Sequence, residues 1–432
     1  LPGYHGRCLK VDLSSRSHDV IEIPNQVLTK FVGGAGLGTW LLLEHCPDGV
    51  DPLAPESPLI FAFSPLVGSP LTTSAKFAVL SKSPLTQRIN DSLSSSGFAI
   101  SGKKSGYDAI MIVGAAASPT CIAVDDSTVR FESADDAWGK SSSDAEQMLS
   151  KRLGKGFRIA AIGPAGENLV RYATVSHDGR HAGRGGLGAV MGSKMLKALA
   201  VRGTQQTAFA FPEELTSYSR DLSKKSFGPA TEKYRELGTV SNLLTFNRLG
   251  TLPTRNFQTG SFENAEQLSP EVMSQTHKRT RASCAACTIG CEHIFHSSDT
   301  SSSDDSTGVR MEYENLFALG PLCGVSDSNV VLQASRLCDD LGLDTISAGG
   351  SIAFAMECVE HGLLDEPELK FGNGDALLAT LRKIGSRDGI GNLLAEGTRI
   401  ASQQIGGGSS AFAAHVKGLE LPGYEPRALQ TM

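Results

Sequence analysis

The sequence predicts an α+β protein in which a β-rich N-terminal domain, residues 1–205, is followed by a mainly α-helical domain, residues 206–432. Two observations predict this class. Apolar runs of strand length alternate with turn residues up to about residue 205, and beyond it apolar residues recur at helical spacing. The length of 432 residues also favours two or more domains, because one hydrophobic core rarely organises so long a chain.

The first domain is predicted from a series of short apolar runs. Turn residues separate the runs PLIFAFSPL, AKFAVLSKSP, YDAIMIVGAA, CIAVDDSTVRFES, FRIAAIGPAG and KALAVRG. The tetrapeptide DDST lies between two β-rich runs and indicates a hairpin. We therefore expect this half of the chain to be mainly sheet.

The second domain is predicted from helical periodicity. Apolar residues recur three and four positions apart in PEELTSYSRDLSKK, VVLQASRLCDDLG and TISAGGSIAFAMECVEHGLL. One stretch breaks this pattern: HSSDTSSSDDSTG, residues 296–308, has almost no apolar side chains. We expect a mobile surface loop there.

The composition excludes several classes of function. The formal net charge is −6, from 40 basic and 46 acidic side chains, and neither sign forms a long run. Nucleic-acid binding and electrostatic membrane binding are therefore not indicated. No apolar stretch is long enough to cross a bilayer. The nine cysteines are scattered apart from one group of three, which favours reduced thiols and a cytoplasmic protein over a disulfide framework.

The group of three cysteines, Cys284, Cys287 and Cys291, has the spacing C-x2-C-x3-C and predicts a metal site. Zinc and iron–sulfur clusters both take tetrahedral, sulfur-rich ligation. With His293 or His296 the cysteines would make a Cys3His zinc site. A [4Fe-4S] cluster would instead need a fourth thiolate from elsewhere in the chain. Spacing alone leaves these two alternatives open.

The glycine-rich stretch AGRGGLGAVMGSK, residues 182–194, indicates an anion-binding loop. Its glycines allow backbone amides to turn inward, and Arg180 and Arg184 add positive charge. A plain turn that leads into a helix is the alternative.

The stretch CDDLGLDTISAGG, residues 338–350, also has two interpretations. In the plain one, a helix ends near Gly342 and Asp344 is the N-cap of the next helix. In the other, a carboxylate such as Asp339 accepts paired N–H bonds from a pterin or guanine edge. Spacing alone does not decide between them.

These motifs, in this order, resemble the tungsten-containing aldehyde:ferredoxin oxidoreductase family. The resemblance extends over almost the whole chain and is carried by GRCLKVDLSS, VDPLAPESPLIF, SKSPLT, SGYDAI, IGPAGENLVRYATV, AGRGGLGAVMGSK, ELGTVSNLL, CAACTIGC, EYENLFALG, CDDLGLDT and LELPGYEPR. It implies that the β-rich domain is the base under a tungsten (or molybdenum) bis-pterin cofactor. It also implies an enzyme that oxidises aldehydes to carboxylic acids and passes electrons through a [4Fe-4S] cluster to ferredoxin.

The resemblance implies a role for each matching residue. Glu314 matches a glutamate that assists proton movement near the metal. Cys284, Cys287 and Cys291 match three ligands of the cluster. The pterin phosphates and pterin edges are expected to contact Lys76, Arg180, Gly183, Arg184, Gly185, Gly186, Asp339, Gly342, Leu343 and Asp344.

Some features depart from the family pattern. Lys76 stands where an arginine is common, which keeps a point charge but loses bidentate geometry. The E-x-x-H motifs that hold an iron between subunits read QASR, residues 333–336, and DALL, residues 375–378. We therefore expect any homodimer to form without a bridging iron.

The family's fourth cluster cysteine and second pterin motif have no counterpart before Met432. We therefore expect a fragment that lacks a third domain. Two alternatives to aldehyde oxidation stay open. One is a relative that reduces a carboxylate or an aromatic ring within a larger complex, and the other is a truncated, non-catalytic remnant.

Overall fold

The protein is described here by a computed structural model that covers residues 1–296 and 308–428. The loop expected at 296–308 lies, apart from its two end residues, outside the described residues. The α+β class is confirmed, and the described residues form two compact units. The first unit contains Leu1–Ser226, Cys284–Thr288 and Asp340–Leu343, and the second contains the described parts of Phe227–Ser283, Ile289–Asp339 and Asp344–Met432. The domain ranges 1–205 and 206–432 stay a prediction.

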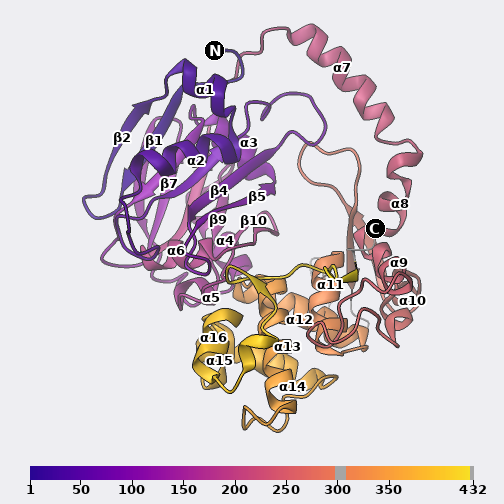
Figure 1. The fold of residues 1–432 in the computed structure, drawn as a ribbon. Coiled ribbons are helices and arrows are strands. Elements are labelled where there is room, and N and C mark those ends of the chain that lie inside the picture. The colour runs from indigo at the N-terminus through magenta and orange to yellow at the C-terminus, as the bar shows by residue number, and fades with distance from the viewer. Residues whose placement is uncertain (297–307, 429–432) are drawn as a thin grey trace. The chain divides into compact units, whose positions relative to one another are not determined.

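Two mixed sheets form the frame of the first unit (Figure 1). The first sheet has the order β2-β1-β6-β3-β4-β5, in which only β1 and β6 run parallel. Its strands are β1 (Arg7–Asp12), β2 (Ser17–Glu22), β3 (Leu59–Phe63), β4 (Lys76–Lys82), β5 (Ile89–Ser95) and β6 (Ala109–Val113).

The second sheet has the order β11-β10-β9-β12-β7-β8, in which only β12 and β7 run parallel. The hairpin expected at DDST is confirmed, because Asp125 pairs with Thr128 across a two-residue turn. The strands of this sheet are β7 (Thr120–Asp125), β8 (Thr128–Ser133), β9 (Arg158–Ala161), β10 (Val175–His177), β11 (Arg180–Ala182) and β12 (Leu196–Arg202).

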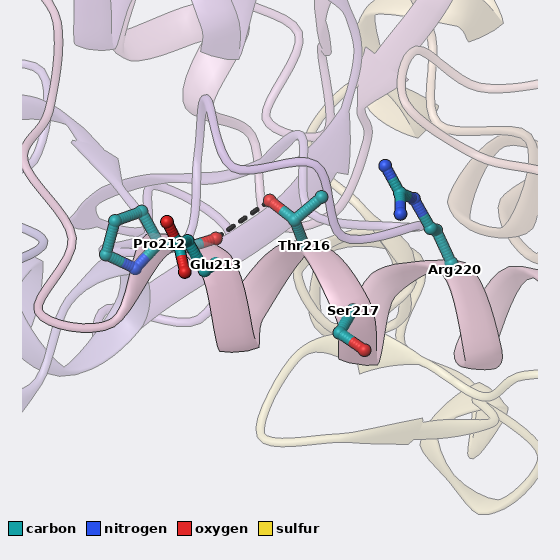
Figure 2. A pocket seen from close by; sticks show the side chains of 5 residues that line it. All are labelled: Pro212, Glu213, Thr216, Ser217 and Arg220. Atoms are coloured by element: carbon teal, nitrogen blue, oxygen red, sulfur yellow. Dashed lines mark hydrogen bonds between the residues drawn. The ribbon is translucent and has the colours of Figure 1, made fainter.

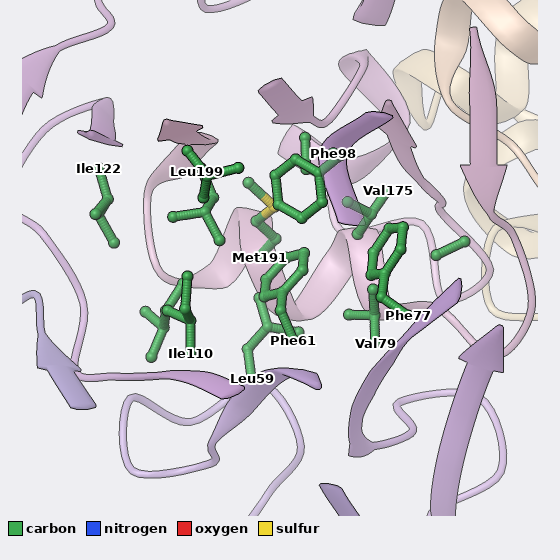
Figure 3. Packing of buried hydrophobic residues seen from close by; sticks show 14 of the residues in the cluster. Leu59, Phe61, Phe77, Val79, Phe98, Ile110, Ile122, Val175, Met191 and Leu199 are labelled. Atoms are coloured by element: carbon green, nitrogen blue, oxygen red, sulfur yellow. The ribbon is translucent and has the colours of Figure 1, made fainter. Parts of the chain in front are cut away.

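A continuous core lies between the two sheets (Figure 3). Alternating residues of β3 point to opposite faces, so Phe61 enters this core while Ile60 packs on the other side. The far face of the first sheet is covered by α1 (Asn25–Phe31) and α2 (Gly34–His45), and that of the second sheet by α4 (Ser142–Leu153). The remaining helices of the unit are α3 (Gly97–Lys104), α5 (Pro164–Glu167), α6 (Leu187–Ser193) and α7 (Pro212–Lys225).

The helix expected from PEELTSYSRDLSKK is confirmed as α7. Pro212 occupies its first turn, where the missing N–H costs nothing. Glu213 and Glu214 lie at the positive end of the helix dipole, and Lys224 and Lys225 lie at the negative end. Local sequence therefore accounts for both ends of α7.

The second unit is mainly helical. Its helices are α8 (Pro229–Leu237), α9 (Asn242–Arg248), α10 (Pro270–Thr276), α11 (Tyr313–Leu319), α12 (Ser328–Leu341, whose last two residues belong to the first unit), α13 (Thr345–Glu360), α14 (Gly374–Ser386), α15 (Ile390–Leu394) and α16 (Thr398–Ile405). Two small antiparallel sheets accompany them: β13 (Lys278–Ala282), β14 (Glu292–His296) and β15 (Val309–Met311), and β16 (His415–Val416) with β17 (Leu419–Glu420). Within 1–296 and 308–428, every helix is too short or too polar to span a bilayer.

Candidate cofactor and metal site

The candidate anion loop begins at a tight hairpin in the first unit. Strands β10 and β11 are joined through Asp178 and Gly179, both with positive φ, so that His177 pairs with Arg180. Residues 183–186 then lead into α6. Gly185 and Gly186 have φ values of 82° and 81°. The backbone is thus a turn that leads into a helix, and anion binding by this loop stays a prediction.

Two of the glycines are required by space as well as by conformation. A Cβ at Gly185 would lie 2.1 Å from the Asn90 Oδ1 atom, and one at Gly186 would lie 2.0 Å from the Arg171 carbonyl oxygen. A Cβ at Gly183 would meet nothing closer than 3.9 Å. The loop is thus closely packed at 185–186 and open at 183.

Strand β5 and its neighbours hold this loop in place. The Asn90 side chain donates to the Arg184 carbonyl over 3.0 Å, and the Arg184 N–H donates to the Ser92 hydroxyl over 3.2 Å. The Ser83 hydroxyl donates to the Gly185 carbonyl over 2.7 Å. The backbone of the loop is therefore fixed from its side, and the position of Arg184 is fixed with it.

Segment 340–343 joins the same unit beside this loop. The Thr174 N–H donates to the Gly342 carbonyl over 2.8 Å, and Leu343 forms an isolated bridge with Ala173. Ala173 in turn accepts the N–H of Gly188, at the start of α6. Gly342 has a φ of 75°, as expected for the residue that ends α12. Segment 340–343 and the glycine loop therefore both contact one short segment, residues 171–174.

The two flanking carboxylates of that motif belong to the second unit. Asp344 is the N-cap of α13, where its side chain accepts the Ile346 N–H over 3.1 Å and the Ser347 hydroxyl over 2.8 Å. The expected N-cap role of Asp344 is confirmed, whereas the pterin contact expected of Asp339 stays a prediction. Asp339 lies in the last turn of α12 and is partly exposed.

Cys284 lies beside two cations of the first unit. Cys287 hydrogen-bonds to its sulfur, and this bond, with the charges of Arg180 and Lys76, lowers the pKa of the Cys284 thiol to about 5 against the opposing effect of burial. A thiol with so low a pKa is a thiolate at neutral pH, and thiolate is the form that binds soft metals. The pair Cys284 and Cys287 therefore has donor chemistry that fits part of an iron–sulfur site.

Cys291 belongs to the second unit, directly before β14. Among residues 1–296 and 308–428, no three His, Cys, Asp or Glu side chains gather as a metal-binding group. Neither the zinc set nor a full cluster set is therefore assembled in the described chain. Of the two histidines considered for zinc, His293 is buried, and His296 is hydrogen-bonded to the Thr280 hydroxyl over 3.0 Å.

Glu314 lies in the first turn of α11, in the second unit. Its Oε2 atom accepts the Gly423 N–H over 2.9 Å, and the hydroxyl of Tyr313 donates to the Gly423 carbonyl. Burial, then the charge of Glu314, raises the pKa of both Tyr313 and Tyr424. The rings of these tyrosines are 5.9 Å apart. Glu314 thus lies beside a pair of tyrosines and is bonded to Gly423. Spacing did not predict this arrangement, because Gly423 is 109 residues away in sequence.

A hollow of about 360 Å³ lies along α7 in the first unit (Figure 2). It is lined by Pro212, Glu213, Thr216, Ser217 and Arg220. The Thr216 hydroxyl donates to the Pro212 carbonyl over 2.8 Å. No predicted site residue lines this hollow, so it carries no part of the site.

Sequence comparisons match both halves of the chain to one family. Residues 8–203 match the N-terminal domain of aldehyde ferredoxin oxidoreductase, and residues 215–432 match its domains 2 and 3. The tungsten-containing aldehyde ferredoxin oxidoreductase of Pyrococcus furiosus is 38% identical over 99% of this chain and 71% of its own length. A protein of the same name from Pyrococcus horikoshii gives the same figures.

Two further relatives have other names. The aliphatic sulfonate oxidoreductase, WOR-like subunit, of Pyrococcus furiosus is 31% identical over 96% of this chain and 70% of its own length. A chain of the active site complex BamBC of benzoyl coenzyme A reductase, in complex with 1,5 dienoyl-CoA, has a TM-score of 0.85 and 28% identity. That match covers 98% of this chain and 66% of the other. Because both family models match and the identity to the first relatives extends over nearly the whole chain, the chain belongs to the aldehyde ferredoxin oxidoreductase family.

Proposed function

We propose that the protein is an oxidoreductase that oxidises aldehydes to carboxylic acids. The observation that carries this proposal is the 38% identity, over 99% of the chain, to tungsten-containing aldehyde ferredoxin oxidoreductases. A tungsten (or molybdenum) bis-pterin would supply the two-electron redox chemistry when bound. The chain's own residues would bind that group, hold the substrate and move protons.

The residues of the first unit would bind the pterin phosphates. Arg180 and Arg184 offer planar guanidinium groups, whereas Lys76 offers a point charge. The fixed backbone at Gly185 and Gly186 and the open position at Gly183 support this role. The pterin edges would contact the motif formed by Asp339, Gly342, Leu343 and Asp344.

Glu314 would act as the general base. Oxidation of an aldehyde with water to a carboxylic acid releases two protons and two electrons for each substrate. The N–H of Gly423 holds the Glu314 carboxylate in one orientation. A carboxylate fixed in this way can accept a proton with little reorganisation.

Cys284, Cys287 and Cys291 would hold three irons of a [4Fe-4S] cluster. The low pKa of Cys284 beside Arg180 supports this role, because metal binding then displaces few protons. The electrons would leave the protein through this cluster to a ferredoxin. We also propose a cytoplasmic protein that binds neither nucleic acid nor membrane and forms, at most, a homodimer without a bridging iron.

An activity assay tests the proposal. The protein is purified without oxygen after growth with tungstate or molybdate and is given acetaldehyde, crotonaldehyde or benzaldehyde with ferredoxin or a viologen dye. We expect dye reduction that depends on the aldehyde and yields the matching acid in equal amount. Protein that holds the metal and the cluster but reduces no dye with any aldehyde would contradict the proposal.

A second candidate function is the reduction of an aromatic ring within a larger complex. It is favoured by the structural similarity to the benzoyl coenzyme A reductase complex, with a TM-score of 0.85. The lower identity, 28% against 38%, makes it the weaker candidate. Oxidation of a cyclic dienoyl-CoA in place of aldehydes, in the same dye assay, would favour it. A truncated remnant would bind neither the metal nor the cluster.

A further inference from the structure

A chain of hydroxyl groups in the first unit holds the loop that carries Cys284 and Cys287. Thr288 directly follows Cys287, and its Oγ1 atom lies 2.8 Å from Thr72 Oγ1 and 2.5 Å from Ser226 Oγ. The Thr288 N–H also donates to Thr72 Oγ1 over 3.0 Å. Thr72 and Ser226 are both buried and Thr288 is partly buried, so these bonds are partly shielded from water.

Each hydroxyl in this chain has only one proton, which limits how its hydrogen bonds can be arranged. The Ser223 carbonyl, 2.7 Å from the Ser226 hydroxyl, can only accept, and when Ser226 donates to it Ser226 accepts from Thr288. In this arrangement Thr288 has used its one hydroxyl proton and accepts from Thr72. The arrangement that satisfies every group in this chain runs from Thr72 through Thr288 and Ser226 to the last turn of α7.

Helix α7 holds the hydroxyl chain at one point and loop 70–73 at another. Ser226 is the C-cap residue of α7, and its hydroxyl ends the chain on the helix backbone. Within α7, the Ser219 hydroxyl donates to the carbonyl of Pro70, which lies two residues before Thr72. The loop at 70–73 and the cysteine loop are thus both tied to the same rigid helix.

The backbone at the same contact adopts an unfavourable conformation. The Thr73 N–H donates to the Ala286 carbonyl over 2.6 Å, and these two residues have φ values of 64° and 53°. Each left-handed residue other than glycine costs roughly 1 kcal/mol, and more when it is β-branched like Thr73. Such strain persists only where surrounding contacts impose it, and it gathers at functional sites. Here the hydrogen bond from Thr73 to Ala286 holds the turn between Cys284 and Cys287. Within that turn the Cys287 N–H donates to the Cys284 carbonyl over 3.1 Å.

We propose that Thr288, with Thr72 and Ser226, is a positioning residue that sets the orientation of the Cys284 and Cys287 thiolates for an iron–sulfur cluster. The inference rests on the proposed function, which supplies the cluster. Loop 70–73 leads directly into β4, which carries Lys76, so the same chain of bonds sets the distance between the thiolates and that cation. A hydroxyl chain of this kind would slow cluster loss and tune the cluster's potential.

The test compares T288V with T288S in the holoenzyme. Valine keeps the shape of the side chain but removes both hydroxyl bonds, whereas serine keeps the hydroxyl. We expect T288V to release iron to a ferrous chelator about tenfold faster than wild type, from the loss of two hydrogen bonds. We also expect an altered midpoint potential in an electron paramagnetic resonance titration. T288S should match wild type in both.

Two further variants keep the test decisive. T29V removes a hydroxyl bond to the Asn25 carbonyl on α1, in the same unit, and should release iron as wild type does. If T288V does not fold, S226A, which removes the far end of the chain, should still release iron about threefold faster.

Two results have different meanings. If T288V releases iron at the wild-type rate and has the wild-type potential, the positioning role of the hydroxyl chain is refuted, while the proposed reaction is unaffected. If T288V does not fold, wild-type iron release from S226A refutes the same role. A wild type that holds about four irons but oxidises no aldehyde would contradict the proposed reaction alone.

Discussion

Glu314 is the residue on which the proposed proton transfer depends. In E314Q the glutamine oxygen can still accept the Gly423 N–H, but the amide cannot take a proton. We expect kcat for aldehyde oxidation to fall by about 10²- to 10⁴-fold, the usual contribution of a general base. The free energy of unfolding should change by less than about 1 kcal/mol. The exposed Glu271 on α10 supplies the control variant E271Q, and E314Q with the kcat of wild type would refute the role.

Glu146 gives the first unit a pH dependence. Burial, then the charge of Asp178, raises the pKa of the Glu146 carboxyl to about 7 from an ordinary 4.5, while its Oε1 atom accepts the Asp178 N–H. Between pH 4.5 and about 7 the folded state therefore binds more protons than the unfolded state, and stability falls as the pH rises through this window.

The variant E146Q tests the predicted fall in stability with rising pH, because a glutamine side chain cannot titrate. As pH rises from 4.5 to 7, wild type should lose about 1–3 kcal/mol of unfolding free energy relative to E146Q. Urea denaturation at a series of pH values measures the difference. E22Q, at an exposed position of β2, should run parallel to wild type. If the difference in unfolding free energy between E146Q and wild type is the same at every pH in this window, the predicted pH dependence is wrong.

At the scale of elements, the glycine loop at 183–186 offers a matched pair. Gly186 combines a φ of 81° with a Cβ position 2.0 Å from the Arg171 carbonyl, whereas Gly183 has space around it. We expect G186A to destabilise the protein by about 3 kcal/mol or more, and G183A by less than about 1 kcal/mol. Urea denaturation of both variants checks this, and equal midpoints would contradict the packing argument.

The elements also show how far the sequence leads. Helix α7, the DDST hairpin and the N-cap at Asp344 could all be predicted, because each depends on side chains within a few positions of one another. The contact of Gly423 with Glu314 and that of Thr72 with Thr288 could not. They join residues 109 and 216 positions apart, and no periodicity or spacing encodes such pairs.

At the scale of the whole molecule, the residues of the candidate site are divided between two compact units. Lys76, Arg180 and Cys284 come together in the first, and Glu314 lies in the second. Spacing left zinc and an iron–sulfur cluster open, because it gives ligand types but not their surroundings. The structure adds these surroundings for Cys284, where the Cys287 hydrogen bond and the charges of Arg180 and Lys76 lower the pKa of the thiol. Thiolates bind both zinc and iron, so the metal content decides between the two sites.

The most direct test of the account is the metal content of wild-type protein purified without oxygen from cells supplied with tungstate and molybdate. Mass spectrometry of the metals should find about one tungsten or molybdenum and about four irons per chain, with pterin released on denaturation. Finding about one zinc per chain, with neither pterin nor tungsten nor molybdenum, would contradict the central claim that this chain works as a metal-pterin oxidoreductase.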